Sequence, residues 1–507
     1  MLLGLDCSTQ SLSALILDTQ AGTIVTQSSV NFEADLPQHQ TTSGFVRGDH
    51  DGEVFSSPLM WLDALDLLLS RLVDEGMDLS QITAISGSGQ QHATVYLNST
   101  FSDTLAALDP QSDLSSQLAP CLSRSLSPIW MDSSTSEECA EIAAAMGGDE
   151  EMGRRTGSTT TQRFSGPQIR RFFKQSPDAW AATDRIHLTS SFLASVLAGK
   201  SVAIDHGDGA GMNLMNLRSG EWDETALAAT APGLAEKLPP LAASSTVAGT
   251  LANYFVEKYH FSPEAKIILW SGDNPCSLVG MGAASPGKMV ISLGTSYTLF
   301  AAMDQPRTDP DGYGHVFGNP CGNFMSLICF HNGALCSERL KNSLGLSWEE
   351  FDQHASVPPT ADSQPSLPFF EAEITPLAPA APQDATTIRS LLDGQFLNML
   401  ARSQWMGTVP NSIYVTGGTS QSHGVCQTIA NIFNAKVQRM ETNASAALGA
   451  AMRAGHATGY SLEALEASFT QPMQDSLVTP DANAVAIYQR MAPRFDATLK
   501  QHLSTPT

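Results

Sequence analysis

The sequence is poor in positive charge. Its 507 residues include 27 lysines and arginines against 51 aspartates and glutamates, a formal net charge of -24, and no run of basic residues stands out. A surface of this sign repels polyanions, so nucleic acid and anionic membranes are disfavoured as partners. A small anion could still bind through backbone N–H groups and a metal ion.

The chain also lacks paired cysteines and long apolar runs. Its eight cysteines are scattered without a Cys-x-x-Cys pair, which favours reduced thiols and a cytoplasmic location. No stretch approaches the roughly 18 apolar residues of a membrane-spanning helix, and the N-terminus lacks the basic segment of a secretion signal. We therefore expect neither secretion nor membrane insertion.

Several common cofactor motifs are missing as well. The segment "ASVLAGKS" ends like a Walker loop, but Ala194 replaces its first glycine. The segments "GSGQQH" and "GDGAGM" have His92 and Met212 where a dinucleotide fingerprint requires its third glycine. No His-Glu-x-x-His zinc pattern occurs, and the twelve histidines do not cluster with the cysteines. The sequence therefore disfavours a P-loop, a Rossmann site and a structural metal.

What the sequence does contain is one order of elements that occurs twice. A chain of this length should form two or more domains. In each half, hydrophobic periodicity predicts strand, small-residue turn, strand, third strand, helix and a further strand. The segments are 2–6, 12–18, 23–32, 57–76 and 82–90 in the first half, and 288–293, 297–303, 323–330, 387–407 and 412–418 in the second. We predict two related α/β domains, residues 1–245 and 246–507, with a cleft where the two turns face each other.

Three strand ends carry candidate chemistry. Asp6 ends an apolar strand and opens the turn "DCSTQS", whose small residues could direct N–H groups at a phosphate. Asp273 and Asn274 follow the strand "IILWSG", where a helix cap and a carboxylate facing the cleft are both compatible with the pattern. Gln91 and His92 follow a third strand and suit a polyhydroxylated ligand, although a hydrogen-bonded histidine at a sheet edge would look the same.

Other candidates are less distinctive. Asp205 and Asp208 lie beside a glycine cluster and compete with Asp273 for the role of a base. Arg163 is an isolated cation, and arginines are most often exposed. The segment "YVTGGTSQSH" predicts a strand, a glycine turn and a helix whose N-terminus could bind an anion or a ribose.

Taken together, these stretches resemble the FGGY family of carbohydrate kinases, most closely its members that act on xylulose. Nine segments occur in the family's order: "DCSTQS", "SPLMWLDALDLLL", "SGSGQQH", "PIWMDSST", "DGAGMNLMNL", "SGDNP", "SLGTSYTLF", "GALCSERL" and "GQFLNML". The resemblance implies a pair of actin-like, ribonuclease H-like domains with the catalytic cleft between them. It also implies ATP-dependent phosphorylation of a ketopentose, at the 5-hydroxyl in the case of D-xylulose, with magnesium and with a homodimer as an option.

The resemblance also assigns roles to residues. It implies that Asp273 is the general base and that Asp6 serves the magnesium–nucleotide through water. The positions implied to bind sugar are Gln91, His92, Arg163, Asp273 and Asn274. Those implied to bind phosphates or nucleotide are Ser8, Thr9, Gln10, Thr295, Trp348, Gly417, Gly418 and Ser422.

Two positions depart from the family pattern. Ala93 replaces a glycine that commonly follows the histidine, which could narrow the sugar pocket, and Ser422 replaces an asparagine near the adenosine. Two other functions remain open: a kinase for ribulose, another ketose or a polyol such as glycerol, and an actin-like or chaperone-like ATPase. The ATPase would require a peptide-binding or polymerising surface, for which no trailing β domain or helical lid is seen after residue 455.

Overall fold

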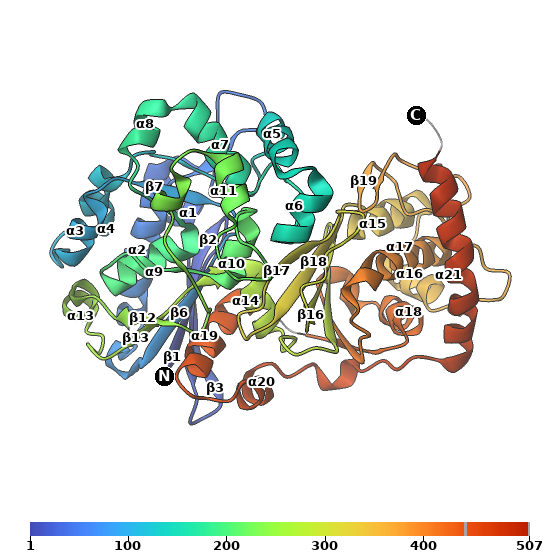
Figure 1. Cartoon of the computed structure of the whole chain (residues 1–507). Coiled ribbons are helices and arrows are strands. Elements are labelled where there is room, and N and C mark those ends of the chain that lie inside the picture. The colour runs from blue at the N-terminus through green and yellow to red at the C-terminus, as the bar shows by residue number, and fades with distance from the viewer. Residues whose placement is uncertain (441–443, 505–507) are drawn as a thin grey trace. The chain divides into compact units, whose positions relative to one another are not determined.

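The computed structural model describes residues 1–440 and 444–504, which form two compact units. The first unit comprises Met1–Gly282, Val316–Phe324 and Ala444–Thr470, and the second comprises Ala283–His315, Met325–Asn443 and Gln471–Thr507. This division differs from the boundary at 245/246, because residues 246–282 complete the sheet of the first unit and a distant C-terminal segment returns to it. In Figure 1 that returning segment is the red pair of helices α19 and α20.

The first unit is built on a mixed sheet. Its strand order is β12-β13-β6-β1-β2-β3, and β14 also pairs with β6. Strand β2 is antiparallel to both β1 and β3, and β12 is antiparallel to β13. Strand β6 is parallel to β1, and β13 and β14 are parallel to β6. Their bounds are β1 Leu2–Cys7, β2 Ser11–Asp18, β3 Thr23–Asn31, β6 Ala84–Gly89, β12 Val247–Thr250, β13 Lys266–Ile268 and β14 Ser271–Gly272.

Helices cover this sheet and its edges. Helix α2, Pro58–Asp74, begins after Ser57 with proline at its first position, as the sequence predicts, and buries Trp61 and Leu65. The C-terminal helix α19, Ser445–Ala457, packs on β1 and β6 and against α14, Asp273–Gly280. The remaining helices are α1 Phe32–Asp35, α3 Phe101–Ala106, α4 Leu114–Leu118, α5 Ser136–Met146, α6 Asp149–Thr156, α7 Ser165–Gln175, α8 Pro177–Ala182, α9 Thr189–Ala198, α10 His206–Gly209, α11 Glu224–Thr230, α12 Leu234–Lys237, α13 Asn253–Tyr259 and α20 Leu462–Phe469.

Three small sheets complete the first unit. They hold β4-β5-β8, β7-β9 and β10-β11, with bounds β4 Val46–Arg47, β5 Val54–Ser56, β7 Thr94–Leu97, β8 Ser127–Pro128, β9 Arg185–Leu188, β10 Ile204–Asp205 and β11 Leu241–Ala242. The core beneath the main sheet is aliphatic and aromatic, and it includes Trp61 and Trp270. Burial of such large apolar side chains is the main favourable term in forming the unit.

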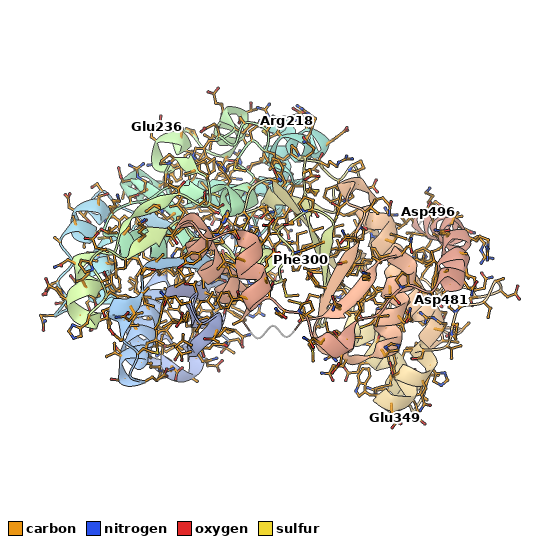
Figure 2. All side chains as sticks on the ribbon, turned by 90° about the horizontal axis from the view of Figure 1, so that it is seen from below. Arg218, Glu236, Phe300, Glu349, Asp481 and Asp496 are labelled. Atoms are coloured by element: carbon orange, nitrogen blue, oxygen red, sulfur yellow. The ribbon has the colours of Figure 1, made fainter. Side chains whose placement is uncertain are left out.

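The second unit repeats the plan. Strand β15 is antiparallel to β16 and parallel to β21, which is parallel to β22, and β18 lies beyond β16. The bounds are β15 Lys288–Leu293, β16 Tyr297–Met303, β18 Phe324–Phe330, β19 Glu373–Ile374, β20 Leu377–Ala378, β21 Ser412–Thr416 and β22 Lys436–Arg439. Strand β17, His315–Gly318, belongs to the first unit from Val316 onward. Phe300, labelled in Figure 2, is one of the buried residues of β16. The predicted duplication of strand, turn, strand, third strand, helix and strand is confirmed.

Helices α16, α17, α18 and α21 of the second unit lie side by side (Figure 1). Asp481, labelled in Figure 2, caps α21 by accepting the Ala484 N–H at 2.9 Å. The bounds are α15 Ala334–Ser343, α16 Trp348–Ala355, α17 Ile388–Ser403, α18 His423–Phe433 and α21 Ala482–Leu503. Across residues 1–440 and 444–504, no helix is both long and apolar enough to cross a bilayer.

Candidate functional site

In the first unit, three parallel strands end at one edge of the sheet. Register pairs Asp6 of β1 with Ser88 of β6, and Ser88 in turn with Ser271 of β14. The residues that follow β6 and β14 include Gln91 and Asp273. Segments separated by more than 200 positions in the chain therefore bring together the acidic and amide residues that the sequence singled out.

Two carboxylates at this edge affect one another. Asp6 is half-buried and accepts a hydrogen bond from Ser88 Oγ at 2.5 Å, while burial raises the pKa of Asp6 to about 6. Burial also raises the pKa of Asp273 to about 7, and the negative charge of Asp6 contributes to that rise. Removal from water disfavours a charged carboxylate, and a like charge nearby adds to the cost. Asp273 can therefore exchange a proton near neutral pH.

Asp273 is the first residue of α14, and Gly272 rather than an aspartate occupies the N-cap position. The Asn274 N–H donates to Asp273 Oδ1 at 2.7 Å, and Asn274 Nδ2 donates to the same atom at 3.1 Å. Asn274 Nδ2 also donates to Gln91 Oε1 at 2.9 Å. In the described part of the chain, no side chain caps α14, so the interpretation of Asp273 as a simple helix cap loses its support.

His92 is held in a strained and well-defined position. Its φ angle is 74°, in the left-handed region, and its ring stacks on Phe164 with a centroid distance of 4.3 Å. His92 Nδ1 lies 2.7 Å from the carbonyl oxygen of Gly211, which can only accept, so Nδ1 carries a proton and Nε2 is the acceptor in the neutral ring. Strained backbone that surrounding contacts maintain is typical of binding sites.

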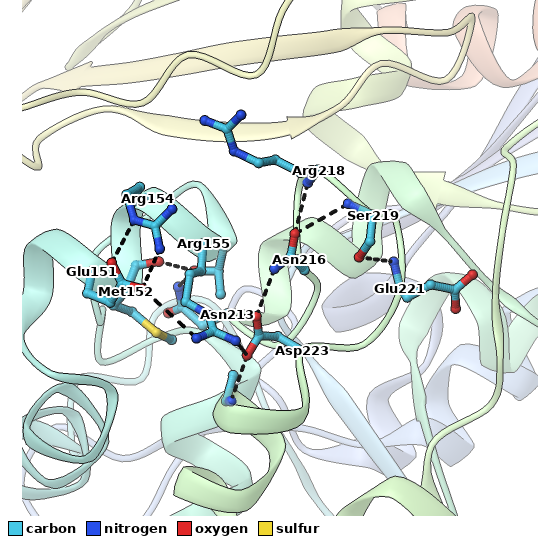
Figure 3. A network of polar contacts seen from close by, with 12 residues as sticks. Glu151, Met152, Arg154, Arg155, Asn213, Asn216, Arg218, Ser219, Glu221 and Asp223 are labelled. Atoms are coloured by element: carbon cyan, nitrogen blue, oxygen red, sulfur yellow. Dashed lines mark hydrogen bonds and ion pairs between the residues drawn. The ribbon is translucent and has the colours of Figure 1, made fainter.

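A polar network supports the segment that holds His92. Figure 3 shows Asp223 accepting both from Arg155, at 2.8 and 2.9 Å, and from Asn216 at 2.9 Å. Asn213 Nδ2 donates to the Ser158 carbonyl at 3.0 Å. These contacts fix the stretch after Gly211 and thereby the acceptor of the His92 ring.

Arg163 lines a pocket of about 310 Å³ in the first unit, together with Trp130 and Asp132. Trp130 is 45% exposed, unusual for a large aromatic side chain, and its Nε1 donates to Thr9 Oγ1 at 2.8 Å. Trp130 thus connects Thr9, which is predicted to bind phosphate, to the pocket of Arg163, which is predicted to bind the sugar. Nothing in the local pattern of the segment "PIWMDSST" shows that the ring of Trp130 is exposed, so the sequence does not indicate this residue.

The predicted phosphate turns differ in their contacts. In the first turn, the Ser8 N–H and Oγ donate to the Ser11 carbonyl at 2.9 and 3.0 Å, while Gln10 is exposed. In the second unit, Thr295 is exposed in the turn between β15 and β16. Ala93, which departs from the family pattern, lies in the apolar core of the first unit.

A pocket of about 580 Å³ lies within the second unit. Trp348, Gly418 and Ser422 line it, as do several residues that the sequence did not indicate: Ala334, Glu338, Glu349, Phe351, Asp352, Thr419 and Gln421. Trp348 is 52% exposed, and Lys341 Nζ lies 5.1 Å from the centre of its ring. An exposed aromatic face beside a pocket of this size is well suited to stack on a planar ring system.

Ser422 and Gly417 have structural roles at this pocket. Ser422 caps α18 by accepting the Val425 N–H at 3.1 Å, and its hydroxyl donates to Asp352. Gly417 has a φ of 90°, and a Cβ there would lie 2.5 Å from the Leu293 carbonyl oxygen. Gly417 therefore permits β21 and β15 to end close together, whereas Gly418 lines the pocket itself.

The other aspartates differ from Asp273. Asp205 and Asp208 are both buried, and the Asp208 N–H donates to Asp205 Oδ1 at 2.8 Å. Burial, followed by the charge of Asp205, raises the pKa of Asp208 well above its usual range. Asp205 and Asp208 are both buried, whereas Asp273 is only half-buried, so Asp273 is the most accessible of the three to a substrate.

A magnesium ion would find an incomplete ligand set here. Among the described residues, no group of three histidine, cysteine, aspartate or glutamate side chains could hold a metal ion. Mg²⁺ commonly binds one or two carboxylates and takes its other ligands from phosphates and water. The carboxylate of Asp6 fits a metal that arrives with a nucleotide.

Comparisons with known proteins cover both units. The model of the FGGY family of carbohydrate kinases, N-terminal domain, matches residues 1–280, and the model of the C-terminal domain matches residues 289–458. The chain is 37% identical to "Xylulose kinase" of Mus musculus, covering 99% of this chain and 94% of the mouse protein. It is also 37% identical to "Xylulose kinase 2" of Arabidopsis thaliana, covering 90% and 87% of the two chains.

Solved structures share the fold. The xylulose kinase from Rhodospirillum rubrum superposes with a TM-score of 0.82 at 20% identity, covering 99% of this chain and 98% of that one. The gluconate kinase from Lactobacillus acidophilus gives a TM-score of 0.80 at 21% identity with the same coverage. At such identities the likeness concerns the fold, and it confirms the predicted pair of actin-like α/β domains.

Proposed function

Because the chain belongs to the FGGY family of carbohydrate kinases, and is therefore a phosphotransferase, we propose that it transfers the γ-phosphate of ATP to the 5-hydroxyl of D-xylulose. The observation that carries the choice of sugar is the 37% identity to the mouse xylulose kinase over 99% of this chain. The matched region spans both units, and so includes the positions that would contact the sugar as well as those that would contact the nucleotide.

Asp273 is the proposed general base. Phosphoryl transfer needs an oriented hydroxyl, an in-line approach and neutralisation of charge, with little covalent work from the protein. Asp273 accepts the proton of the attacking 5-hydroxyl, whose oxygen forms the bond to the γ-phosphorus as the bond to the β,γ-bridging oxygen breaks. The raised pKa of Asp273, about 7, suits this role because a base operates best with a pKa near the working pH.

The remaining site residues bind the substrates in this proposal. In the first unit, Gln91, His92, Arg163 and Asn274 hold the sugar. The phosphates are held by Ser8, Thr9, Gln10 and, in the second unit, Thr295. Trp348, Gly417, Gly418 and Ser422 serve the adenosine. Asp6 holds Mg²⁺ through water, and the ion would neutralise charge on the phosphates.

A coupled assay of ADP release tests the proposal. The panel contains D-xylulose, D-ribulose, glycerol, gluconate and a reaction without sugar. We expect strong stimulation by D-xylulose alone. Rapid ADP release without sugar would instead support an ATPase of the actin or chaperone type and would overturn the proposal.

A kinase for another polyol is the second candidate. One observation favours it: the gluconate kinase from Lactobacillus acidophilus shares the fold with a TM-score of 0.80, close to the 0.82 of the xylulose kinase from Rhodospirillum rubrum. Pocket contacts rather than fold decide between related sugars. Stimulation by gluconate, ribulose or glycerol exceeding that by xylulose would select this candidate.

The rate should fall as the pH falls through 7. Protonated Asp273 cannot accept the hydroxyl proton, and its pKa of about 7 places the loss of activity in this range. We expect kcat/KM for xylulose, measured between pH 5 and 9 with saturating ATP, to show an acid limb near pH 7. An acid limb near the ordinary aspartate pKa of about 4 would contradict this prediction.

Replacing Trp348 should affect the nucleotide alone. Trp348→Ala removes the exposed ring of the second-unit pocket, and loss of one aromatic stacking partner costs about 1–3 kcal/mol for a base. We expect KM for ATP to rise about 10-fold while KM for xylulose stays constant, and Trp348→Phe to restore most of the affinity. An unchanged KM for ATP in the alanine variant would place the adenosine elsewhere.

Two further features belong to the proposal. All eight cysteines are free thiols, which fits the reducing cytoplasm where we place the reaction. A homodimer, which the resemblance to the family implies, is tested by light scattering of the purified chain.

A further inference from the structure

A line of polar side chains runs from Asp273 into the interior of the first unit. Asp273 Oδ1 accepts from Asn274, and Asn274 Nδ2 donates to Gln91 Oε1. The Gln91 side chain interacts with the carboxyl group of Asp208, and Ser190 Oγ donates to Asp208 Oδ2 at 2.5 Å. Four side chains thus connect the proposed base to α9 and α10.

The Gln91 amide is enclosed, so its orientation matters. A Cβ on Gly272 would lie 2.6 Å from Gln91 Cγ, and one on Gly211 would lie 3.3 Å from Gln91 Nε2. Because Asn274 donates to Oε1, the Nε2 end is directed away from Asn274. A rotated amide would bring two NH₂ groups together and leave the Asn274 donor without its acceptor.

Asp208 carries the carboxyl group to which Gln91 Nε2 can donate a hydrogen bond. Its side chain is fully buried, and its position is fixed by Ser190 and by the Asp208 N–H donating to Asp205 Oδ1. Within the described residues, Gln91 Nε2 and Asp208 Oδ1 are both buried, and neither has a partner at hydrogen-bond distance. A buried donor and a buried acceptor each cost free energy unless they satisfy one another, directly or through a water molecule.

We propose that Asp208 is a positioning residue for phosphoryl transfer: its carboxyl group accepts from Gln91 Nε2, so that Gln91 Oε1 holds Asn274 and Asn274 holds Asp273 in place. The inference rests on the proposed role of Asp273 as the base. Asp208 itself does not contact the substrate.

The charge state of Asp208 fits this role. Burial and the neighbouring carboxylate of Asp205 raise the pKa of Asp208 well above the ordinary value, which favours the neutral form of the group. A neutral Asp208 still offers an acceptor oxygen to Gln91 and does not repel Asp273. Asparagine offers the same acceptor, with an NH₂ group that can donate to Ser190 Oγ, whereas alanine offers neither.

The test compares Asp208→Asn and Asp208→Ala in the full chain, with ADP release driven by xylulose as the readout. Small misplacement of a catalytic group can cost about 100-fold in rate. We expect Asp208→Ala to lower kcat about 10- to 100-fold with a smaller change in KM for xylulose, and Asp208→Asn to stay within about threefold of the wild-type kcat.

A control separates positioning from stability. Asp66 of α2 accepts hydrogen bonds from Tyr254 and Tyr259 in the same unit, at 2.9 and 2.8 Å, and is not part of the site. Asp66→Ala should lower Tm and leave kcat and KM unchanged at 20 °C. If Asp208→Ala does not fold, Ser190→Ala tests the inference in its place. This variant removes the hydrogen bond from Ser190 Oγ to the Asp208 carboxyl group and should lower kcat severalfold.

Three results would overturn the inference. They are an Asp208→Ala enzyme with the wild-type kcat, an Asp208→Asn enzyme as impaired as Asp208→Ala, and, where Asp208→Ala cannot be made, a Ser190→Ala enzyme with the wild-type kcat. In each of them the wild type is active on xylulose, so the proposed function survives. An inactive wild type would instead overturn the proposed function together with this inference.

Discussion

Replacing Asp273 by asparagine is expected to lower kcat for xylulose phosphorylation by about 10²- to 10⁴-fold, the usual contribution of a general base. Asparagine keeps an oxygen to accept from the Asn274 N–H, which is 2.7 Å from Oδ1 in the wild type, but it cannot take a proton. Geometry and the binding of sugar should therefore persist while proton transfer fails. Steady-state ADP release measures kcat, and calorimetry with xylulose measures binding.

Two controls accompany this variant. The Tm should stay within about 2 °C of the wild type, because Asp273 makes no side-chain cap for α14 in the described structure and the substitution preserves its volume. Near-normal turnover by Asp273→Asn would transfer the base role to Asp205 or Asp208. Both are buried, and a base at either position would need an opening of the site that half-buried Asp273 does not require.

Local pattern was enough to predict the repeated strands and turns of both sheets, although it did not indicate β12, β17 or β22. Apolar residues at successive positions of β1 and β15, followed by small residues, indicate buried strands ending in tight turns. Ser57 and Pro58 mark the start of α2 because proline lacks the N–H that a first helical residue leaves unpaired. Where a short-range signal has a physical cause, the prediction agrees with the structure.

The pairing of segments that lie far apart in the chain could not be predicted from the sequence. Strand β13 joins β6, and α19 returns to the first unit from the far end of the chain, so the unit does not end at residue 245. No residue near 245 carries information about a partner that lies about 160 positions earlier or 200 positions later. The same applies to Asp352 and Trp130, whose places beside a pocket depend on how α16 and a surface loop pack.

The site residues likewise divide into those that local pattern identifies and those whose roles depend on contacts between distant segments. Asp6, Gln91 and Asp273 are identifiable as polar residues after buried strands, and parallel strands bring their ends together. The proposed link from Gln91 to Asp208 would depend on side-chain packing among separate segments, which no spacing in the sequence encodes.

The second large effect concerns Gly449, in the helix that supports the base. In α19, Gly449 faces α14, which begins at Asp273; a Cβ at residue 449 would overlap the Cys276 carbonyl oxygen and lie 2.8 Å from the Gly280 nitrogen. Both contacts are with backbone, which cannot rotate away as a side chain can. Overpacking of this kind costs about 1–3 kcal/mol and more when the backbone must move.

Gly449→Ala should therefore lower the free energy of unfolding of the first unit by about 3 kcal/mol and also reduce kcat, because α14 must shift and carries Asp273 with it. Gly153 provides the matched control: it is also inside a helix of the first unit, α6, but a Cβ there would have no neighbour closer than 3.8 Å. Gly153→Ala should raise stability by about 0.5–1 kcal/mol through helix propensity and leave kcat unchanged. Urea unfolding measures the change in stability, and ADP release measures the change in kcat. Equal stabilities for the two alanine variants would show that α14 and α19 have room to separate. The close contact between these helices would then not be what holds Asp273 in place.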